Sequence, residues 1–293
     1  MSNSFKIGAI SGLSAGFVKA LVAIFIAVPL VFNLGLTYYW IPPPPATPFT
    51  RIIANEMAVN LIFGVIWGLI YSRVYRAIPG KGILKGLLFG VFGYLLWQIR
   101  WVTLFLVYGD MASVGQFIIY GFLVWIPFGI ILGIVYEYLR NRYYVPKKEL
   151  KLKQYDVISG FYPGAFAGIL GGIASFITNF ASHDLAEYLI PGHVIDFSLL
   201  LGQFGSQIMH HLIWGVILGL IYPKVYNLVP GKGITKGLIY GFIAQFLIFE
   251  LNIIFYSIGM GYFMLAHMIF FTGIAQSIIY GLVLGYLYRK PPK

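Results

Sequence analysis

The sequence of 293 residues has no cysteine and few charged residues. Without cysteine, the chain cannot form disulfides, CxxC redox pairs or thiolate metal sites, and it has no cysteine nucleophile. Charged residues make up 10% of the chain, whereas soluble domains average about 25%. Hydrophobic residues fill their place at 59% of the chain. This composition excludes a soluble domain and predicts a polytopic membrane protein.

Long apolar stretches recur along the whole chain. A helix needs about 20 mainly apolar residues to cross a bilayer, and eight stretches satisfy this length. Each is apolar on all sides, which favours helices over the alternating strands of a barrel. The sequence therefore predicts an all-α integral membrane protein with eight transmembrane helices, near residues 6–33, 51–73, 83–108, 112–138, 157–180, 200–222, 234–258 and 262–288.

Basic residues gather in alternate loops. Seventeen of the 20 Lys and Arg residues fall on one side of the eight predicted spans, in the two termini, the loops near 73–85 and 224–236, and the stretch 140–153. Since Lys and Arg accumulate in cytoplasmic loops, both termini should be cytoplasmic, in a multi-pass protein of the plasma membrane. The net charge of +11 then reflects topology and contact with membrane lipids. Nucleic acid is not expected as a partner.

Two segments of the chain are nearly the same. Residues 62–87 read IFGVIWGLIYSRVYRAIPGKGILKGL, and residues 213–238 read IWGVILGLIYPKVYNLVPGKGITKGL, 151 positions later. The match extends to Ile10-Ser11-Gly12, which we pair with Ile158-Ser159-Gly160. Four spans per half predict two parallel four-helix repeats, related by a pseudo-two-fold axis along the membrane normal. The expected boundaries are 1–140 for the first repeat, 141–156 for a basic cytoplasmic linker and 157–293 for the second repeat.

Glycines and a PGKG turn stand out within each repeat. Glycines spaced four residues apart predict grooves for close helix packing. The duplicated PGKG turn lacks the GxxxxGK[ST] pattern of a phosphate loop. Its lysines, with those that follow, are instead expected to lie at the lipid headgroups: Lys81, Lys85, Lys232 and Lys236.

Polar residues inside the spans are candidates for function, because each is costly to insert. Glu56 and Asn60 share one helix face, and Gln207 and His211 occupy the matching positions of the second half, next to His210. One hypothesis is a polar site at the repeat interface that binds a small solute or ion, or relays protons. The other is a set of hydrogen bonds that hold helices together.

The remaining intramembrane charges are Lys19, Arg100 and Glu250. Arg100 could pair with Glu250 or with Glu56, and the sequence leaves this open. We predict no cofactor. A less favoured alternative is haem iron held by His211 and His267, against which stands the expected difference in their depth in the membrane.

The function that these features favour is a transporter or channel for a small solute or ion. The alternative is a non-catalytic membrane subunit that scaffolds or anchors a larger complex, such as a respiratory one, with protein partners in the membrane. An enzyme is less favoured, because the spans carry no HExxH motif and no paired aspartates.

Overall fold

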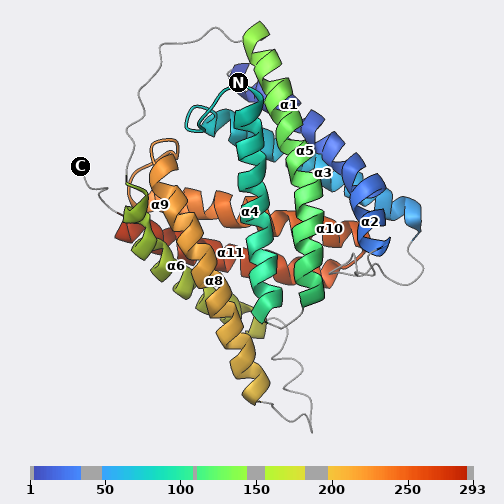
Figure 1. The fold of residues 1–293 in the computed structure, drawn as a ribbon. Coiled ribbons are helices and arrows are strands. Elements are labelled where there is room, and N and C mark those ends of the chain that lie inside the picture. The colour runs from blue at the N-terminus through green and yellow to red at the C-terminus, as the bar shows by residue number, and fades with distance from the viewer. Residues whose placement is uncertain (1–2, 34–47, 108–110, 144–155, 182–196, 289–293) are drawn as a thin grey trace. The chain divides into compact units, whose positions relative to one another are not determined.

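The computed structural model describes residues 3–33, 48–107, 111–143, 156–181 and 197–288 (Figure 1). Within these ranges every regular element is a helix. The chain divides into two compact units, Met1–Leu152 with Tyr256–Gly261, and Lys153–Phe255 with Tyr262–Lys293. Most of the predicted linker 141–156 lies outside the described residues.

The first unit contains α1 (Asn3–Val22), which continues through the π-helix η1 (Ala23–Ala27) into α2 (Val28–Asn33). It also contains α3 (Phe49–Val74), α4 (Ile83–Val107) and α5 (Met111–Tyr143). Helix α1 packs on α3 and α5, and α4 packs on α5. The segment Tyr256–Gly261 groups with this unit, unlike the predicted boundaries, and Arg51 Nε donates to the Gly259 carbonyl oxygen at 2.8 Å.

The second unit contains the 3-10 helix η2 (Val157–Gly160), α6 (Phe161–Asn179) and α8 (Phe197–Val225). Helix α9 (Ile234–Gly241) continues through the nine-residue π-helix η4 (Phe242–Glu250) into α10 (Leu251–Met260), and α11 (Phe263–Leu287) follows. Helix α6 packs on α8 and α11, and α11 packs on α9. The helix pairs therefore occur in the same order as in the first unit.

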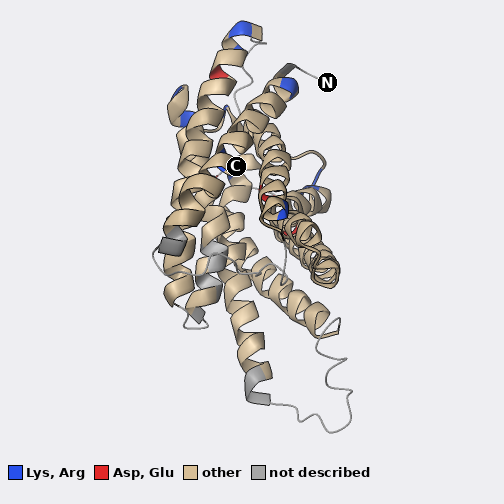
Figure 2. Cartoon of the chain, turned by 90° about the vertical axis from the view of Figure 1, so that its right-hand side faces the viewer, with Lys and Arg blue, Asp and Glu red and all other residues tan. Residues whose placement is uncertain are grey.

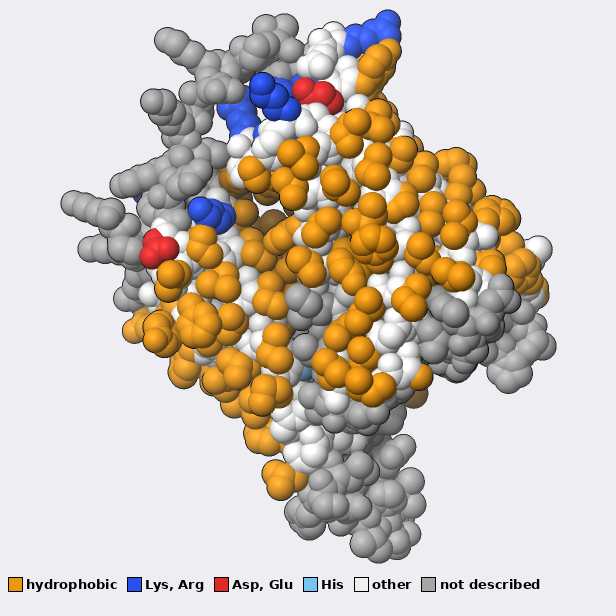
Figure 3. All heavy atoms as spheres, in the orientation of Figure 1, with side chains coloured by type: hydrophobic (Ala, Val, Ile, Leu, Met, Phe, Trp, Pro, Cys, Tyr) orange, Lys and Arg blue, Asp and Glu red, His pale blue; other side chains and the backbone are white. Residues whose placement is uncertain are grey.

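Within the described residues, seven helices are long and apolar enough to cross a membrane, so the chain is compatible with a multi-pass membrane protein. They agree with seven of the eight predicted spans. The eighth predicted span, 83–108, corresponds to the helix α4. Its apolar stretch within the described residues, Ile83–Gln98, is shorter than the other seven. Figure 3 shows why such helices suit lipid: orange apolar side chains cover most of the described surface in that view.

Helices within each unit touch through backbone atoms at glycines. A Cβ added to Gly12 would overlap the carbonyl oxygen of Gly64, and a Cβ added to Gly164 would overlap that of Gly215. Gly164 therefore has the place in α6 that Gly12 has in α1. The pairing of Gly12 with Gly160 in the sequence is wrong by one helical turn, because four-residue glycine spacing lets two registers match equally well.

The PGKG turns end α3 and α8 and start the next helix. Gly80 and Gly82 have φ of 89° and 51°, and Gly231 and Gly233 have 93° and 48°. Residues other than glycine rarely adopt these positive φ values. Figure 2 marks the Lys and Arg positions in blue, and several of them lie at helix ends. The Arg73 guanidinium, in the last turn of α3, packs 4.6 Å from the centre of the Phe5 ring.

Candidate functional site

Glu56 and Asn60 lie one turn apart on α3, and both are buried. Asn60 Nδ2 donates to the Glu56 carboxylate at 3.1 Å and to the Glu56 carbonyl oxygen at 2.9 Å. The Asn60 carbonyl oxygen faces α1, since a Cβ added to Gly16 would overlap it. The predicted polar pair is therefore a joined group buried in the packing of the first unit.

Lys19 reaches the same part of the first unit from α1. Its Nζ lies 4.1 Å from the centre of the Trp125 ring of α5, which is a favourable distance for a cation over an indole face. Glu56 supplies the negative charge that acts on this ammonium group. The structure thus adds Trp125, which the sequence did not single out, as the ring contact of Lys19.

His211 on α8 is the centre of a polar chain in the second unit. Its Nδ1 lies 2.8 Å from the Gln207 carbonyl oxygen, and its Nε2 lies 2.7 Å from Gln276 Oε1 on α11. Gln276 Nε2 in turn donates to Glu250 Oε1 at 2.5 Å. The side chains of His211, Gln276 and Glu250 are all at most 4% exposed.

The other second-half candidates surround this chain. His210 is buried, and its ring centre lies 5.1 Å from that of His211, with the rings nearly perpendicular. Gln207 contributes its backbone carbonyl oxygen. Gln276 was not among the candidates chosen from the sequence. It could have been found as a polar residue inside the apolar span 262–288.

The predicted candidates fall into different units. Glu56 and Asn60 belong to the first unit, and Gln207, His210 and His211 belong to the second. The side chain of Arg100 lies outside the described residues, so its pairing stays a prediction.

His211 and His267 have different neighbours in the second unit. His211 binds Gln276, which follows His267 by nine residues, or about 13 Å along α11. His267 is exposed and packs against Phe271, with ring centres 4.7 Å apart. The difference in height along the helices counts against an axial pair, as the sequence led us to expect, and the haem alternative stays a prediction.

The four lysines predicted at the headgroups separate into two kinds. Lys81 and Lys232 are exposed. Lys85 Nζ instead donates to the Tyr75 carbonyl oxygen at 2.7 Å, and Lys236 Nζ donates to that of Tyr226 at 2.5 Å. Each of these two lysines caps the end of the preceding helix.

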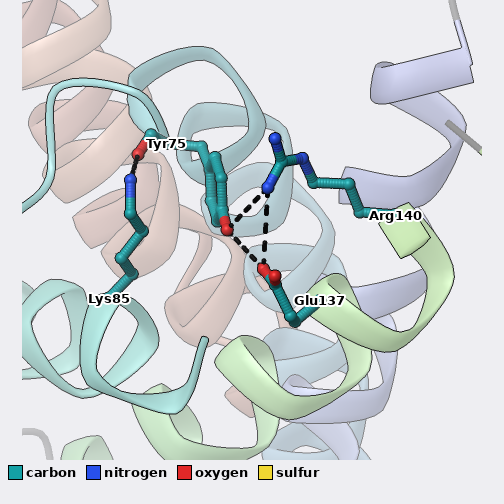
Figure 4. Close-up of polar contacts among 4 residues, drawn as sticks. All are labelled: Tyr75, Lys85, Glu137 and Arg140. Carbon is teal, nitrogen blue, oxygen red and sulfur yellow. Dashed lines mark hydrogen bonds and ion pairs between the residues drawn. The ribbon is translucent and has the colours of Figure 1, made fainter. Parts of the chain in front are cut away.

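Tyr75 links three helices of the first unit (Figure 4). Its hydroxyl donates to the Glu137 carboxylate of α5, and Arg140 Nη1 donates to the same hydroxyl at 3.1 Å. Burial and the hydrogen bond to Glu137 raise the pKa of Tyr75 to about 12. This cluster joins the ends of α3, α4 and α5. It could not be predicted from the sequence, because Glu137 and Arg140 follow Tyr75 by 62 and 65 residues.

Residues Gly12 to Gly16 read GLSAG and match the G-x-S-x-G pattern of serine hydrolases. That pattern needs a sharp turn between a strand and a helix. Ser14 instead lies inside α1, and its hydroxyl donates to the Ile10 carbonyl oxygen at 3.0 Å. The structure gives this serine no catalytic geometry.

No family model, curated protein or solved structure matches the chain.

Proposed function

We propose that the protein is a transporter or channel for a small solute or ion. The observation that carries the proposal is the buried chain His211–Gln276–Glu250 inside membrane-compatible helices. Each ionisable residue in a span costs about 2.5–3.5 kcal/mol on insertion scales, so such residues commonly mark ion or substrate pathways. The buried Glu56 and the half-buried Lys19 add a second pair of ionisable residues within the helices of the first unit.

We propose that the chain has eight spans in two duplicated repeats, with both termini in the cytoplasm. Repeated tyrosine clusters support the duplication. Their ring centres are 4.8–5.5 Å apart in the first unit and 5.2–5.5 Å apart in the second. The clusters are Tyr71, Tyr75 and Tyr136, and Tyr222, Tyr226 and Tyr288. The duplicated lysine caps support it further.

The test is electrical recording from proteoliposomes on a supported membrane. The vesicles are challenged with a panel of cations, anions, amino acids and sugars, and with pH steps. We expect a current for at least one class, and its loss in Glu56→Gln and His211→Ala. His267→Ala, at an exposed position on the same helix as Gln276, is the matched control and should keep the current.

The alternative is a subunit that anchors a larger membrane complex. Extraction from the native membrane in mild detergent separates the two functions. Proteins that co-purify at constant stoichiometry, together with no current for any solute, would favour the subunit. A Soret band in the same preparation would show that the protein binds haem.

A further inference from the structure

We propose that His211, Gln276 and Glu250 form a binding site for one proton, which lies on either the histidine or the glutamate, with the Gln276 amide turned to match each form. The ligand is the proton itself. This inference goes beyond transport, because the site can be detected in a protein that moves no solute.

The hydrogen bonds fix where the proton lies in the structure. A backbone carbonyl oxygen only accepts, so His211 Nδ1 donates to the Gln207 oxygen and carries a hydrogen. Gln276 turns its amide NH₂ toward the Glu250 carboxylate and its oxygen toward His211. His211 Nε2 therefore donates as well. Both ring nitrogens carry hydrogen, which makes His211 an imidazolium opposite an ionised Glu250.

A second arrangement satisfies the same three side chains. If Gln276 rotates its amide by 180°, its NH₂ donates to a neutral His211 Nε2, and its oxygen accepts from a protonated Glu250. The Nε2–H bond of His211 is broken and an O–H bond forms on Glu250. The number of protons and the net charge of the group are unchanged. The site therefore has two forms with equal hydrogen bonding and one proton in each.

Losing that proton is unfavourable. A neutral His211 beside an ionised Glu250 has one N–H for two accepting oxygens, or leaves Gln276 turned away from the carboxylate. Either arrangement leaves one of these hydrogen bonds unmade inside the protein, which is unfavourable. Burial of all three side chains excludes the water that would otherwise compensate.

The helices that carry the site, α8, η4 and α11, contain no acidic residue other than Glu250. Glu250 is the only acidic residue between positions 197 and 293 of the sequence. Ionisable side chains on the packed helices include His210 on α8, whose ring adjoins that of His211, Tyr280 on α11 and Tyr240 on α9. The predicted pairing of Arg100 with Glu250 lies outside the described residues. Both tyrosine hydroxyls donate to carbonyl oxygens of α8, at 3.2 Å for Tyr280 and 2.7 Å for Tyr240.

Two glycines make room for the charged side chains. A Cβ added to Gly273 would lie 2.5 Å from Glu250 Cγ, and a Cβ added to Gly172 of α6 would lie 3.0 Å from His211 Cβ. Helix α6 adds no ionisable side chain beyond Tyr162 at its start. Glu250 itself ends the π-helix η4, and π-helical segments occur frequently at functional sites.

The test is ¹⁵N NMR of the imidazole rings, in full-length protein labelled at its five histidines and reconstituted in lipid. A ring with two N–H groups and a ring with one give clearly different ¹⁵N shifts. At neutral pH we expect the His211 signal, assigned by its absence in His211→Asn, to be doubly protonated. Glu250→Gln removes the balancing charge and should convert His211 to the singly protonated form.

Gln276→Leu should break the link and give the same loss of the doubly protonated signal. Gln245→Leu is the matched control, because it also replaces a buried glutamine of the second unit, and Gln245 Oε1 has no hydrogen-bond partner within the described part of the chain. The control should leave the His211 signal unchanged. A singly protonated His211 in the wild type, or the same signal in all variants, would overturn the proposal.

Infrared spectroscopy provides a second measurement if one variant fails to fold. In His211→Asn the proton has no ring to occupy, so Glu250 should be protonated and show a carboxylic acid C=O band. The band should be absent in the double variant His211→Asn with Glu250→Gln. If His211→Asn lacks the band as well, the two residues do not share a proton. A current in proteoliposomes is not needed for either result, so the proton site and the transport function can fail separately.

Discussion

At the residue scale, Lys85 and Lys236 show how one side chain can fix the end of a helix. The last carbonyl groups of a helix have no partner within it, and a lysine ammonium group satisfies one of them while opposing the helix dipole. Lys85 and Lys236 each follow the tyrosine whose oxygen they bind by ten residues.

Replacing Lys85 by Met should therefore destabilise the protein. Hydrogen bonds to charged groups contribute about 1.5–3 kcal/mol, so we expect a loss of about that size in the free energy of unfolding. The exposed Lys81→Met is the control and should change it by less than about 0.5 kcal/mol. Thermal unfolding in one detergent, followed by tryptophan fluorescence, compares the two. Equal stability of both variants would contradict the cap.

Tyr75 gives a prediction on pH. Its pKa is raised to about 12 in the folded protein, whereas an unfolded tyrosine titrates near 10. The folded state then holds the phenolic proton between these values, so stability falls as pH rises from about 10 to about 12. Tyr75→Phe should be less stable than the wild type near pH 8 and should lose less stability over that interval. Equal slopes for the two proteins would refute the assignment.

At the element scale, the packing of α1 on α3 depends on glycines that face each other. A Cβ added to Gly64 would overlap the Gly12 carbonyl oxygen. The helices would have to separate and lose dispersion contacts along their length. Low side-chain volume, rather than hydrogen bonding, permits this close approach.

Gly64→Ala should therefore lower stability by about 1–3 kcal/mol, the usual cost of overpacking. Gly115→Ala is the control within the same unit, because an added Cβ there meets nothing within 4 Å. The control should be neutral or up to about 1 kcal/mol more stable, since Ala is the better helix former. Chemical unfolding in mixed micelles measures both. A neutral Gly64→Ala would mean that α1 and α3 are not in backbone contact.

At the scale of the whole molecule, membrane orientation is the property to test first. Basic residues predict that position 147 faces the cytoplasm and position 184 faces outward. Because the chain has no cysteine, Lys147→Cys and Asp184→Cys each introduce a single label site. An impermeant thiol reagent on intact cells should label position 184 and should reach position 147 only after lysis. Labelling of both positions in intact cells would contradict the eight-span topology.

The helices could be predicted from the sequence, but their neighbours could not. Bounds such as 51–73 against Phe49–Val74 agree closely, because length and apolar content determine where a helix can cross lipid. The link from His211 to Gln276 could not be foreseen, since an all-round apolar helix such as α11 gives no sign of which face meets which helix. The lysine caps could have been predicted from the sequence, because the ten-residue spacing from Tyr75 to Lys85 recurs in the second half.

The glycine contacts between α1 and α3 also restrict how the sequence can evolve. When two large side chains collide, a smaller residue on the opposite helix can restore the fit. Gly12 and Gly64 each present their backbone to the other, and no residue is smaller than glycine. A substitution on one helix therefore has no compensating substitution on its partner. Selection for intragenic suppressors of a bulky residue at Gly64 should recover only true revertants at that codon.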